Sequence, residues 1–413
     1  MSVPALTEDV RSFAPVTFTG GNGVFRRLVT RGALLELITF GFYRFWLTTD
    51  IRRHLWSRTE IDGDALEYIG RGKELLFGFL VATAVLAPAF LVYFVIGLEF
   101  ERYTAFASVP LYALLFAFGQ FAVYRARRYR LTRTVWRGVR FWMTGSGWAY
   151  AWRSILWGLL LPPTLGFAYP WRMAALERYK LRHTRYGNLS GRFEATGWQL
   201  FKRVWWVWLL GLLPWLLLPA VPILVVLAVA PGKSHSPPAA VGVAAGLALL
   251  LGLVGVWFLP FLHAIRRAKE WAWWAGGIRF GDVAVVCKLG PGDLIGIYWK
   301  LIGLGLLVLV GYTALAGAIT AALHFGAPSG GLLPAILQGE LPIWGLAGHA
   351  LMYLTLLLAL GVLARIYTLQ RVWRRVIGAC IVINIRAAGN VAADGNTVSG
   401  FGEGLLDGLD FGL

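Results

Sequence analysis

The sequence predicts an all-α polytopic membrane protein: six transmembrane helices in three hairpins, two short re-entrant or interfacial elements, and short β-segments forming a cytoplasmic layer. The first observation is composition, because the 413 residues are 58% hydrophobic and only 15% charged, with a mean hydropathy of +0.63. A soluble domain carries about 25% charged residues. The second is a set of long uncharged runs that recur in pairs, and the third is an uneven distribution of basic residues. Composition alone excludes an ordinary soluble enzyme and a disordered chain.

Six stretches are long enough to cross the hydrocarbon core of a bilayer, which takes roughly 20 apolar residues. None contains Lys, Arg, Asp or Glu, and they cover residues 75–98, 104–124, 204–230, 239–262, 301–323 and 343–364. Short connections at 99–103, 231–238 and 324–342 join them two by two. This spacing predicts three helical hairpins.

Basic residues indicate the orientation of these hairpins. Of 39 Lys and Arg, the three short connections hold only Arg102 and Lys233. Because basic loops stay in the cytoplasm, both termini and the long segments between hairpins are predicted to be cytoplasmic, with the three tips outside.

Two further apolar segments, 32–46 and 154–171, do not qualify as long uncharged stretches like the six above. The first is short and carries Glu36 and Arg44, and the second is interrupted by Pro162, Pro163 and Pro170. A single crossing by the second would move an arginine-rich segment outside and invert every later loop. We therefore interpret both as re-entrant or interfacial elements that return to the cytoplasmic side, and spanning helices are the alternative.

These two segments also reveal an internal repeat. LELITFGFYRFW at 35–46 resembles LLPPTLGFAYPW at 160–171, and the same offset of 125 residues matches Gly72 with Gly197 and Leu75 with Leu200. The repeats divide the chain into a cytoplasmic N-terminal segment (1–31), repeat 1 (32–145), repeat 2 (146–292), a third hairpin (293–376) and a β-segment with an acidic Gly-rich tail (377–413).

A β-like run follows each basic helix end. These runs are short, rich in aromatic or β-branched residues and bounded by glycine, at 65–69, 139–144, 192–196, 278–289 and 376–386. One such piece is not stable alone. We expect them to pair into a small sheet or barrel under the helices, and separate docking against the headgroups is the alternative.

The T-[LF]-G-F-x-x-x-W element, followed by an Arg/Tyr-rich helix end, resembles the YjgN-like family of bacterial inner-membrane proteins, a family of unknown function. Thr164 to Trp171 carries the most specific part of the resemblance, and the copy ending at Trp46 departs from it at Phe40 and at Arg44-Phe45. The resemblance implies a multi-pass protein of the bacterial inner membrane. It supplies no catalytic residue.

Two sets of residues are candidates for function. The first could line a solute path or act as a structural wedge between hairpins, and comprises Thr39, Gly41, Trp46, Thr164, Gly166 and Trp171. The second is a juxtamembrane run that would contact anionic lipid headgroups, and comprises Arg125, Arg127, Arg128, Arg130, Arg133 and Arg137.

Motifs for other chemistry were not found. The six histidines are scattered, the two cysteines are far apart in the sequence, and no phosphate-binding glycine loop occurs. We expect no catalytic residue, metal or cofactor, and no nucleic-acid partner. The predicted partners are the bilayer and its anionic phospholipids, with a homo-oligomer or a protein partner left open. Two functions follow: a non-enzymatic membrane protein that binds or transports a small or lipidic solute, or a scaffold whose arginine-rich face recruits anionic lipid or a protein.

Overall fold

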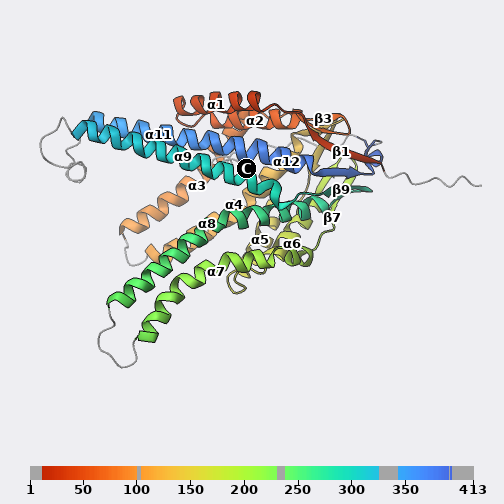
Figure 1. Ribbon diagram of the computed structural model, residues 1–413. Coiled ribbons are helices and arrows are strands. Elements are labelled where there is room, and N and C mark those ends of the chain that lie inside the picture. Colours follow the sequence, from red (N-terminus) through yellow and green to blue (C-terminus); the bar gives the residue numbers. More distant parts are fainter. Residues whose placement is uncertain (1–11, 100–103, 230–237, 325–342, 390, 393–413) are drawn as a thin grey trace, which may run out of the picture.

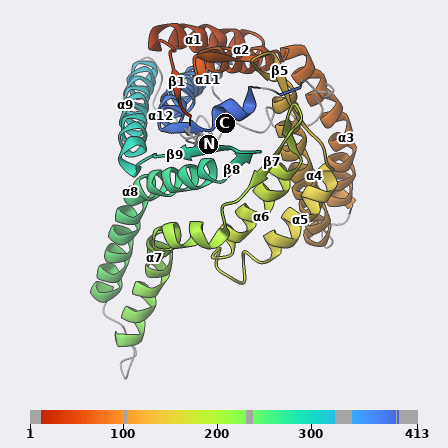
Figure 2. The same cartoon turned by 90° about the vertical axis from the view of Figure 1, so that its right-hand side faces the viewer.

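The computed structural model describes residues 12–99, 104–229, 238–324, 343–389 and 391–392. Ten strands form a closed antiparallel barrel in the order β1-β10-β9-β8-β7-β6-β5-β4-β3-β2. The strands gather at one end of the molecule and the long helices extend from it (Figure 1). Seen along the perpendicular direction, the helices lie around the strands (Figure 2). The all-α fold class predicted above is therefore wrong.

Five copies of one unit build this fold. In four of them, a helix ends at a short strand, a tight turn leads into a second strand, and a new helix leaves the barrel. The strands are β1 (Phe13–Phe18), β2 (Thr59–Ile61), β3 (Asp64–Tyr68), β4 (Thr134–Trp136), β5 (Val139–Met143), β6 (Thr184–Tyr186), β7 (Leu189–Phe193), β8 (Ile278–Phe280), β9 (Val283–Cys287) and β10 (Cys380–Ile383).

The fifth unit is divided between the two ends of the described chain. Strand β10 follows the last helices and pairs with β1, which precedes the first, in the register Phe13↔Ile383. The Asn384 N–H extends this pairing by donating to the Ser12 carbonyl oxygen at 2.8 Å. The barrel is thus closed by a pairing across almost the whole sequence, which removes any free strand edge.

Side chains fill the barrel. One apolar cluster joins residues of strands on opposite sides of it, including Val16 of β1, Trp136 of β4, Tyr186 of β6 and Val382 of β10. The buried Tyr186 hydroxyl donates to the Trp136 carbonyl oxygen at 3.0 Å. The barrel is a packed core, as in other small barrels.

The six apolar stretches form the long helices α3 (Gly72–Glu99), α4 (Thr104–Thr132), α7 (Gly197–Val229), α8 (Pro238–Gly276), α9 (Pro291–His324) and α11 (Ile343–Ala364). Helix α11 continues through a π-helical segment, η2 (Arg365–Arg371), into α12 (Val372–Gly378). Of the predicted connections 99–103, 231–238 and 324–342, residues 100–103, 231–237 and 325–342 lie outside the described residues, and so do residues 393–413 of the acidic tail.

Within the described chain, four stretches rather than the predicted six are long and apolar enough to cross a membrane. They are Gly72–Ile96, Val109–Thr132, Pro291–Ala318 and Ala350–Gly378. Helices α7 and α8 are not among the four spans found in the described residues.

The two short elements are helical hairpins that return to the barrel. Helix α1 (Asn22–Ile38) follows β1, and α2 (Arg44–Ser57) leads into β2. In the same way α5 (Gly147–Leu159) follows β5 and α6 (Tyr169–Arg182) leads into β6. Each arm is 13 to 17 residues long, below the roughly 20 that a full crossing needs.

The strands of each repeat pair with those of the next, so one barrel includes strands from several of the predicted segments. The division of the chain into these segments stays a prediction. The predicted β-like runs contain β5, β8, β9 and β10, most of β3 and part of β7. The sequence did not indicate β1. It also did not indicate β2, β4 and β6, because each has only three residues and therefore too little alternation of apolar and polar positions to be recognised.

Candidate functional site

The tips of the two short hairpins contain the predicted threonine elements. The Thr39 hydroxyl donates to the Leu35 carbonyl oxygen at 2.7 Å and accepts the Tyr43 N–H at 2.9 Å. Thr164 repeats the arrangement, with the Leu160 carbonyl oxygen at 2.6 Å and the Ala168 N–H at 3.3 Å. Each hydroxyl therefore ends one helix and starts the next, and its hydrogen bonds are made within its own turn.

The residue pair after each threonine reverses the chain in left-handed backbone. Phe40 and Gly41 have φ of +51° and +89°, and Leu165 and Gly166 have +48° and +83°. Only glycine adopts this region without strain. The non-glycine member of each pair points its apolar side chain outward, since Phe40 is 94% and Leu165 66% exposed. Both tips thus present a large apolar residue to the surroundings.

Trp46 and Trp171 pack against the start of a long helix. A Cβ atom on Gly72 would lie 2.9 Å from the Trp46 Cα, and one on Gly197 would lie 2.7 Å from the Trp171 Cα. The tryptophan backbones can approach only because glycine stands there. Both tryptophans, together with Gly166 beside Trp208, therefore position the short hairpins against α3 and α7.

We use the term joint for the place where the outgoing helix of one unit packs on the incoming helix of the next. Five equivalent hydrogen bonds mark the joints: Thr19 to Arg58, Ile69 to Arg133, Thr144 to His183, Glu194 to Gly277 and Lys288 to Ala379, each N–H donating to a carbonyl oxygen at 2.9–3.0 Å. Six residues after each donor stands a buried anchor, at most 4% exposed: Phe25, Leu75, Tyr150, Leu200 and Leu294.

The residue that faces the anchor lies four positions before each acceptor. In four joints it carries a ring, and the five residues are His54, Tyr129, Tyr179, Trp273 and Arg375. Arg375 is the exception, with a side chain that is 62% exposed. Arg375 is thus the one of these five residues that carries no ring.

The joint between α3 and α4 is filled, and we call it the closed joint. The buried Tyr129 hydroxyl donates to the Glu74 carboxylate at 2.8 Å, and Arg133 pairs with the same carboxylate at 2.8 Å. The Arg133 guanidinium also lies 5.3 Å from the Tyr129 ring centroid. Polar groups here satisfy each other.

Glu177 occupies an equally closed position between α4, α6 and α8. Its carboxylate pairs with Arg127 at 3.0 Å and with Lys180, and accepts the Trp274 indole N–H at 3.0 Å. Burial by itself would raise the pKa of Glu177, but the charges of Lys180 and Arg127 outweigh it and hold the pKa at about 2. The carboxylate is therefore ionised and binds three helices together.

The other arginines of the predicted lipid-contact run lie on α4 or in the strand hairpin that follows it. Arg137 pairs with Asp62 and Asp64 of the neighbouring strand hairpin. Arg125, Arg128 and Arg130 are half-buried on α4. Arg127, Arg133 and Arg137 thus have protein partners, and lipid contact by this run stays a prediction.

Glu36, singled out in the sequence, pairs across the fold. Its two carboxylate oxygens accept the Arg365 guanidinium at 2.7 and 3.2 Å. Arg365 begins the π-helical segment η2. This ion pair fixes the short hairpin α1–α2 against the end of α11.

The joint between α9 and α12 is hollow, and we call it the open joint. Its cavity of about 770 Å³ is lined by Asn22, Gly292, Asp293, Gly296, Ile297, Lys300, Arg371, Arg374, Arg375, Gly378 and Ala379. Four of these are basic and one is acidic. The first turn of α9 borders the cavity, and so does the first turn of α1, whose N-cap Gly21 gives no side-chain cap.

Two of the four basic side chains are held in place. The Arg374 guanidinium donates to the Gly20 carbonyl oxygen and lies over the Phe18 ring. Arg371 lies 3.9 Å from the Tyr367 ring centroid. Arg375 reaches the Asp293 carboxylate only at 3.9 Å. Positive charge and helix N-termini together favour an anion.

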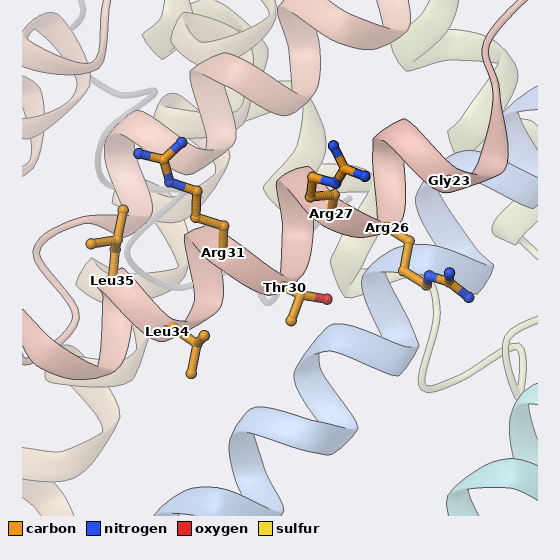
Figure 3. A pocket seen from close by; sticks show the side chains of 7 residues that line it. All are labelled: Gly23, Arg26, Arg27, Thr30, Arg31, Leu34 and Leu35. Carbon is orange, nitrogen blue, oxygen red and sulfur yellow. The ribbon is translucent and has the colours of Figure 1, made fainter.

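Two further cavities contain basic residues. One of about 580 Å³ occupies the equivalent joint between α7 and α8, where Glu194 and Trp273 accompany Lys202, Arg203 and Arg279. The other, of about 670 Å³, lies along the exposed face of α1, where Arg26, Arg27 and Arg31 accompany Thr30, Leu34 and Leu35 (Figure 3). None of these three cavities is lined by Thr39 or Thr164. Among the described residues, no three His, Cys, Asp or Glu lie close enough to hold a metal ion.

A comparison with protein families finds one family model, described as "Bacterial protein of unknown function (DUF898)", which matches residues 13–408. No match was found among the curated proteins or among the solved structures.

Proposed function

We propose that this chain, which belongs to the DUF898 family, is a non-enzymatic multi-pass scaffold of the bacterial inner membrane that binds anionic phospholipid at the open joint. We further assign it to the YjgN-like proteins, on the Thr164–Trp171 element. Its barrel and both termini would lie in the cytoplasm, and its partners would be the bilayer and anionic headgroups.

The repeat supports this topology. Every helical hairpin, long or short, begins and ends at a strand of the barrel. The barrel therefore lies on one side of a membrane that the long hairpins enter, and the basic joints come at the level of the headgroups. The outward Phe40 and Leu165 suit insertion of the short hairpins into the near leaflet.

The open joint carries the functional proposal. Lys300 stands at its edge on α9, and exposed Leu304, Leu306 and Leu307 follow on the same helix. A lipid phosphate in the cavity would place its acyl chains along this apolar surface. Basic residues at a bilayer surface attract anionic lipid by roughly 1 kcal/mol each.

The transport hypothesis is less well supported. It required hydroxyls of Thr39 and Thr164 that were free to meet a solute, whereas both are used in closing their own turns. The barrel is also filled by side chains. The scaffold is therefore the function that we propose.

Thermal unfolding of the detergent-solubilised protein tests lipid binding. Phosphatidylglycerol should raise the Tm of the wild type by several degrees more than phosphatidylcholine, because a ligand that binds only the folded state stabilises it. The double variant Arg371→Gln/Arg375→Gln should lose most of this difference. A matched control, Arg53→Gln/Arg182→Gln, removes two exposed arginines outside the cavity and should keep it.

Three results would contradict the proposal. The first is an equal shift with both lipids in the wild type. The second is an unchanged difference in the double variant. The third is a shift of the same size with inorganic phosphate alone, which would assign the open joint to a soluble anion.

Cysteine labelling in cells tests the orientation. In a background with Cys287→Ser and Cys380→Ser, a membrane-impermeant maleimide should label Glu101→Cys, His235→Cys and Gly330→Cys from outside. Arg185→Cys and Asp282→Cys, at the barrel, should react only after lysis. Labelling of the barrel positions in intact cells would invert the proposed topology.

A further inference from the structure

The two cysteines of the chain, 93 positions apart, face each other at the base of the open joint. Cys287 ends β9, Cys380 begins β10, and they are direct partners in the antiparallel register. The next pair outward is hydrogen-bonded, since the Lys288 N–H donates to the Ala379 carbonyl oxygen at 2.9 Å. The cysteines therefore occupy a non-hydrogen-bonded pair, where Cα atoms lie about 4.5 Å apart. Disulfides span about 4.4–6.8 Å between Cα atoms.

The other four joints show what normally stands at these two positions. The pairs are Phe18↔Thr59, Tyr68↔Thr134, Met143↔Thr184 and Phe193↔Ile278. Each threonine hydroxyl donates to the carbonyl oxygen four residues earlier at 2.8 Å, which ends its helix. The Cys380 thiol does the same with the Val376 carbonyl oxygen at 3.1 Å.

Cys380 thus keeps the helix-ending role of threonine, whereas Cys287 replaces a larger side chain. Folding alone does not require sulfur at either position, because the threonine joints close in the same way. The fifth joint is the one in which both partners are thiols.

We propose that Cys287 and Cys380 are a site of oxidative modification, at which a peroxide converts the two thiols into a reversible cross-strand disulfide. The bond would fasten the last strand of the barrel to β9 and fix α12 against α9. This inference goes beyond lipid binding and does not depend on it.

The surroundings assign the two sulfurs different parts in the reaction. The Cys380 thiol proton can turn from the Val376 carbonyl oxygen to the Cys287 sulfur, and this hydrogen bond lowers the pKa of Cys287 to about 7, although burial opposes the shift. The same hydrogen bond, together with burial, raises the pKa of Cys380. Cys287 is half-buried and Cys380 is buried. The attacking thiolate is therefore that of Cys287.

The reaction has two balanced steps. The Cys287 thiolate attacks hydrogen peroxide, the O–O bond breaks, and a sulfenic acid and hydroxide form. The Cys380 sulfur then displaces the sulfenic oxygen, which leaves as water with the proton of the Cys380 thiol. Sulfur loses two electrons in total and peroxide gains them. A dithiol reverses the bond by thiol–disulfide exchange.

Intact-mass measurement after alkylation tests this site. The reduced full-length protein should take up two alkyl groups, and the peroxide-treated protein should take up none and weigh two mass units less than the reduced, unmodified chain. Dithiothreitol should restore both reactive thiols. The oxidised form should also unfold at a Tm several degrees higher, because a bond between residues this far apart restricts the unfolded chain.

The variant Cys380→Thr restores the residue found at three other joints and serves as the folded control. It should leave Cys287 free to form a sulfenic acid that a dimedone probe captures, without intramolecular disulfide. The proposal is overturned if peroxide gives sulfinic acid or dimers linked between chains in the wild type, or if both thiols remain alkylatable. The phosphatidylglycerol shift is measured on the same samples, so either proposal can fail while the other stands.

Discussion

The closed joint between α3 and α4 and the open joint between α9 and α12 are built on one backbone. Both have the same inter-strand hydrogen bond, and both bury a leucine anchor completely, Leu75 in one and Leu294 in the other. They differ in the residue opposite the anchor, which is a buried Tyr129 in the first and an exposed Arg375 in the second. In the first joint the Tyr129 ring packs on the anchor, whereas in the second the charged Arg375 side chain turns outward and lines a cavity.

The comparison shows how a repeat protein can acquire a site without changing its fold. The buried anchor and the inter-strand hydrogen bond stabilise each joint. The residue opposite the anchor can therefore vary without loss of the joint. In the closed joint it completes a hydrogen-bonded cluster with Glu74 and Arg133. In the open joint it contributes to an electropositive cavity.

The largest expected effect tests whether the anchors are common to both joints. Leu75→Ala and Leu294→Ala should each destabilise the protein by about 3 kcal/mol, because each removes a fully buried side chain. Thermal unfolding in detergent, followed by tryptophan fluorescence, measures both. Leu307→Ala, at an exposed position of α9, is the control and should change the Tm little. If either variant unfolds at the wild-type Tm, the anchor does not have the same role in the two joints.

The second largest effect on stability is expected at Glu177 of α6, a buried charge that is satisfied as completely as Glu74 in the closed joint. Glu177→Gln should cost about 3 kcal/mol, because Arg127 and Lys180 lose their shared buried counter-charge. The same unfolding assay measures it. A loss of less than about 1 kcal/mol would mean that solvent reaches the cluster.

The pH dependence of stability tests the same carboxylate. Its folded-state pKa of about 2 lies below the ordinary value of 4.5, so the stabilisation is complete above pH 4.5 and is lost as the pH falls towards 2. The wild-type Tm should therefore decline across this window more steeply than that of Glu177→Gln. Parallel curves would contradict the assignment.

The acidic residues of the two joints give a smaller and unequal pair of effects. Glu74→Gln should cost about 1–2 kcal/mol, because it weakens hydrogen bonds to Tyr129 and Arg133. Asp293→Asn keeps an oxygen that can accept the Gly290 N–H, and the charged partner Arg375 is exposed and 3.9 Å away, so this change should cost at most about 0.5 kcal/mol. It should also increase the extra rise in Tm that phosphatidylglycerol gives over phosphatidylcholine, because it removes the one acidic side chain among the described residues that line the cavity. Equal costs in the unfolding assay would remove the distinction between closed and open joints.

The smallest effect concerns the tips of the short hairpins. Gly41→Ala should cost about 1 kcal/mol, the penalty for a Cβ atom in left-handed backbone. Gly166→Ala should cost somewhat more, because the new Cβ would also lie 3.1 Å from the Trp208 ring. Gly211→Ala, in a helix with open space around it, is the control. A neutral Gly41→Ala in thermal unfolding would show that this tip relaxes.

Part of the fold could be predicted from local pattern. The offset of 125 residues pairs Leu75 with Leu200, and the structure places both in the same buried role. The glycine-bounded runs mark where strands occur. The threonine elements lie in the two segments that the sequence sets apart from the long apolar stretches, but their turns and hydrogen bonds required coordinates.

The candidate site was much less predictable. The arginine run of α4 reads as a basic surface in the sequence, and only the fold reveals that Arg127 meets Glu177 and that Arg133 meets Glu74. The open joint combines the first turns of α1 and α9 with α12, which are distant in the chain. Cys287 and Cys380 appear unrelated until the register of β9 and β10 sets them opposite each other.

The sequence by itself determined which segments are apolar enough to enter a bilayer, where the chain turns, and that one unit recurs, because length, hydropathy and glycine positions act over a few residues. The tertiary structure decided that the short strands close into a barrel, that its last gap is sealed by the two ends of the described chain, and which charges neutralise one another. Such pairings depend on which distant segments become neighbours, and burial stabilises them only after the whole barrel has formed.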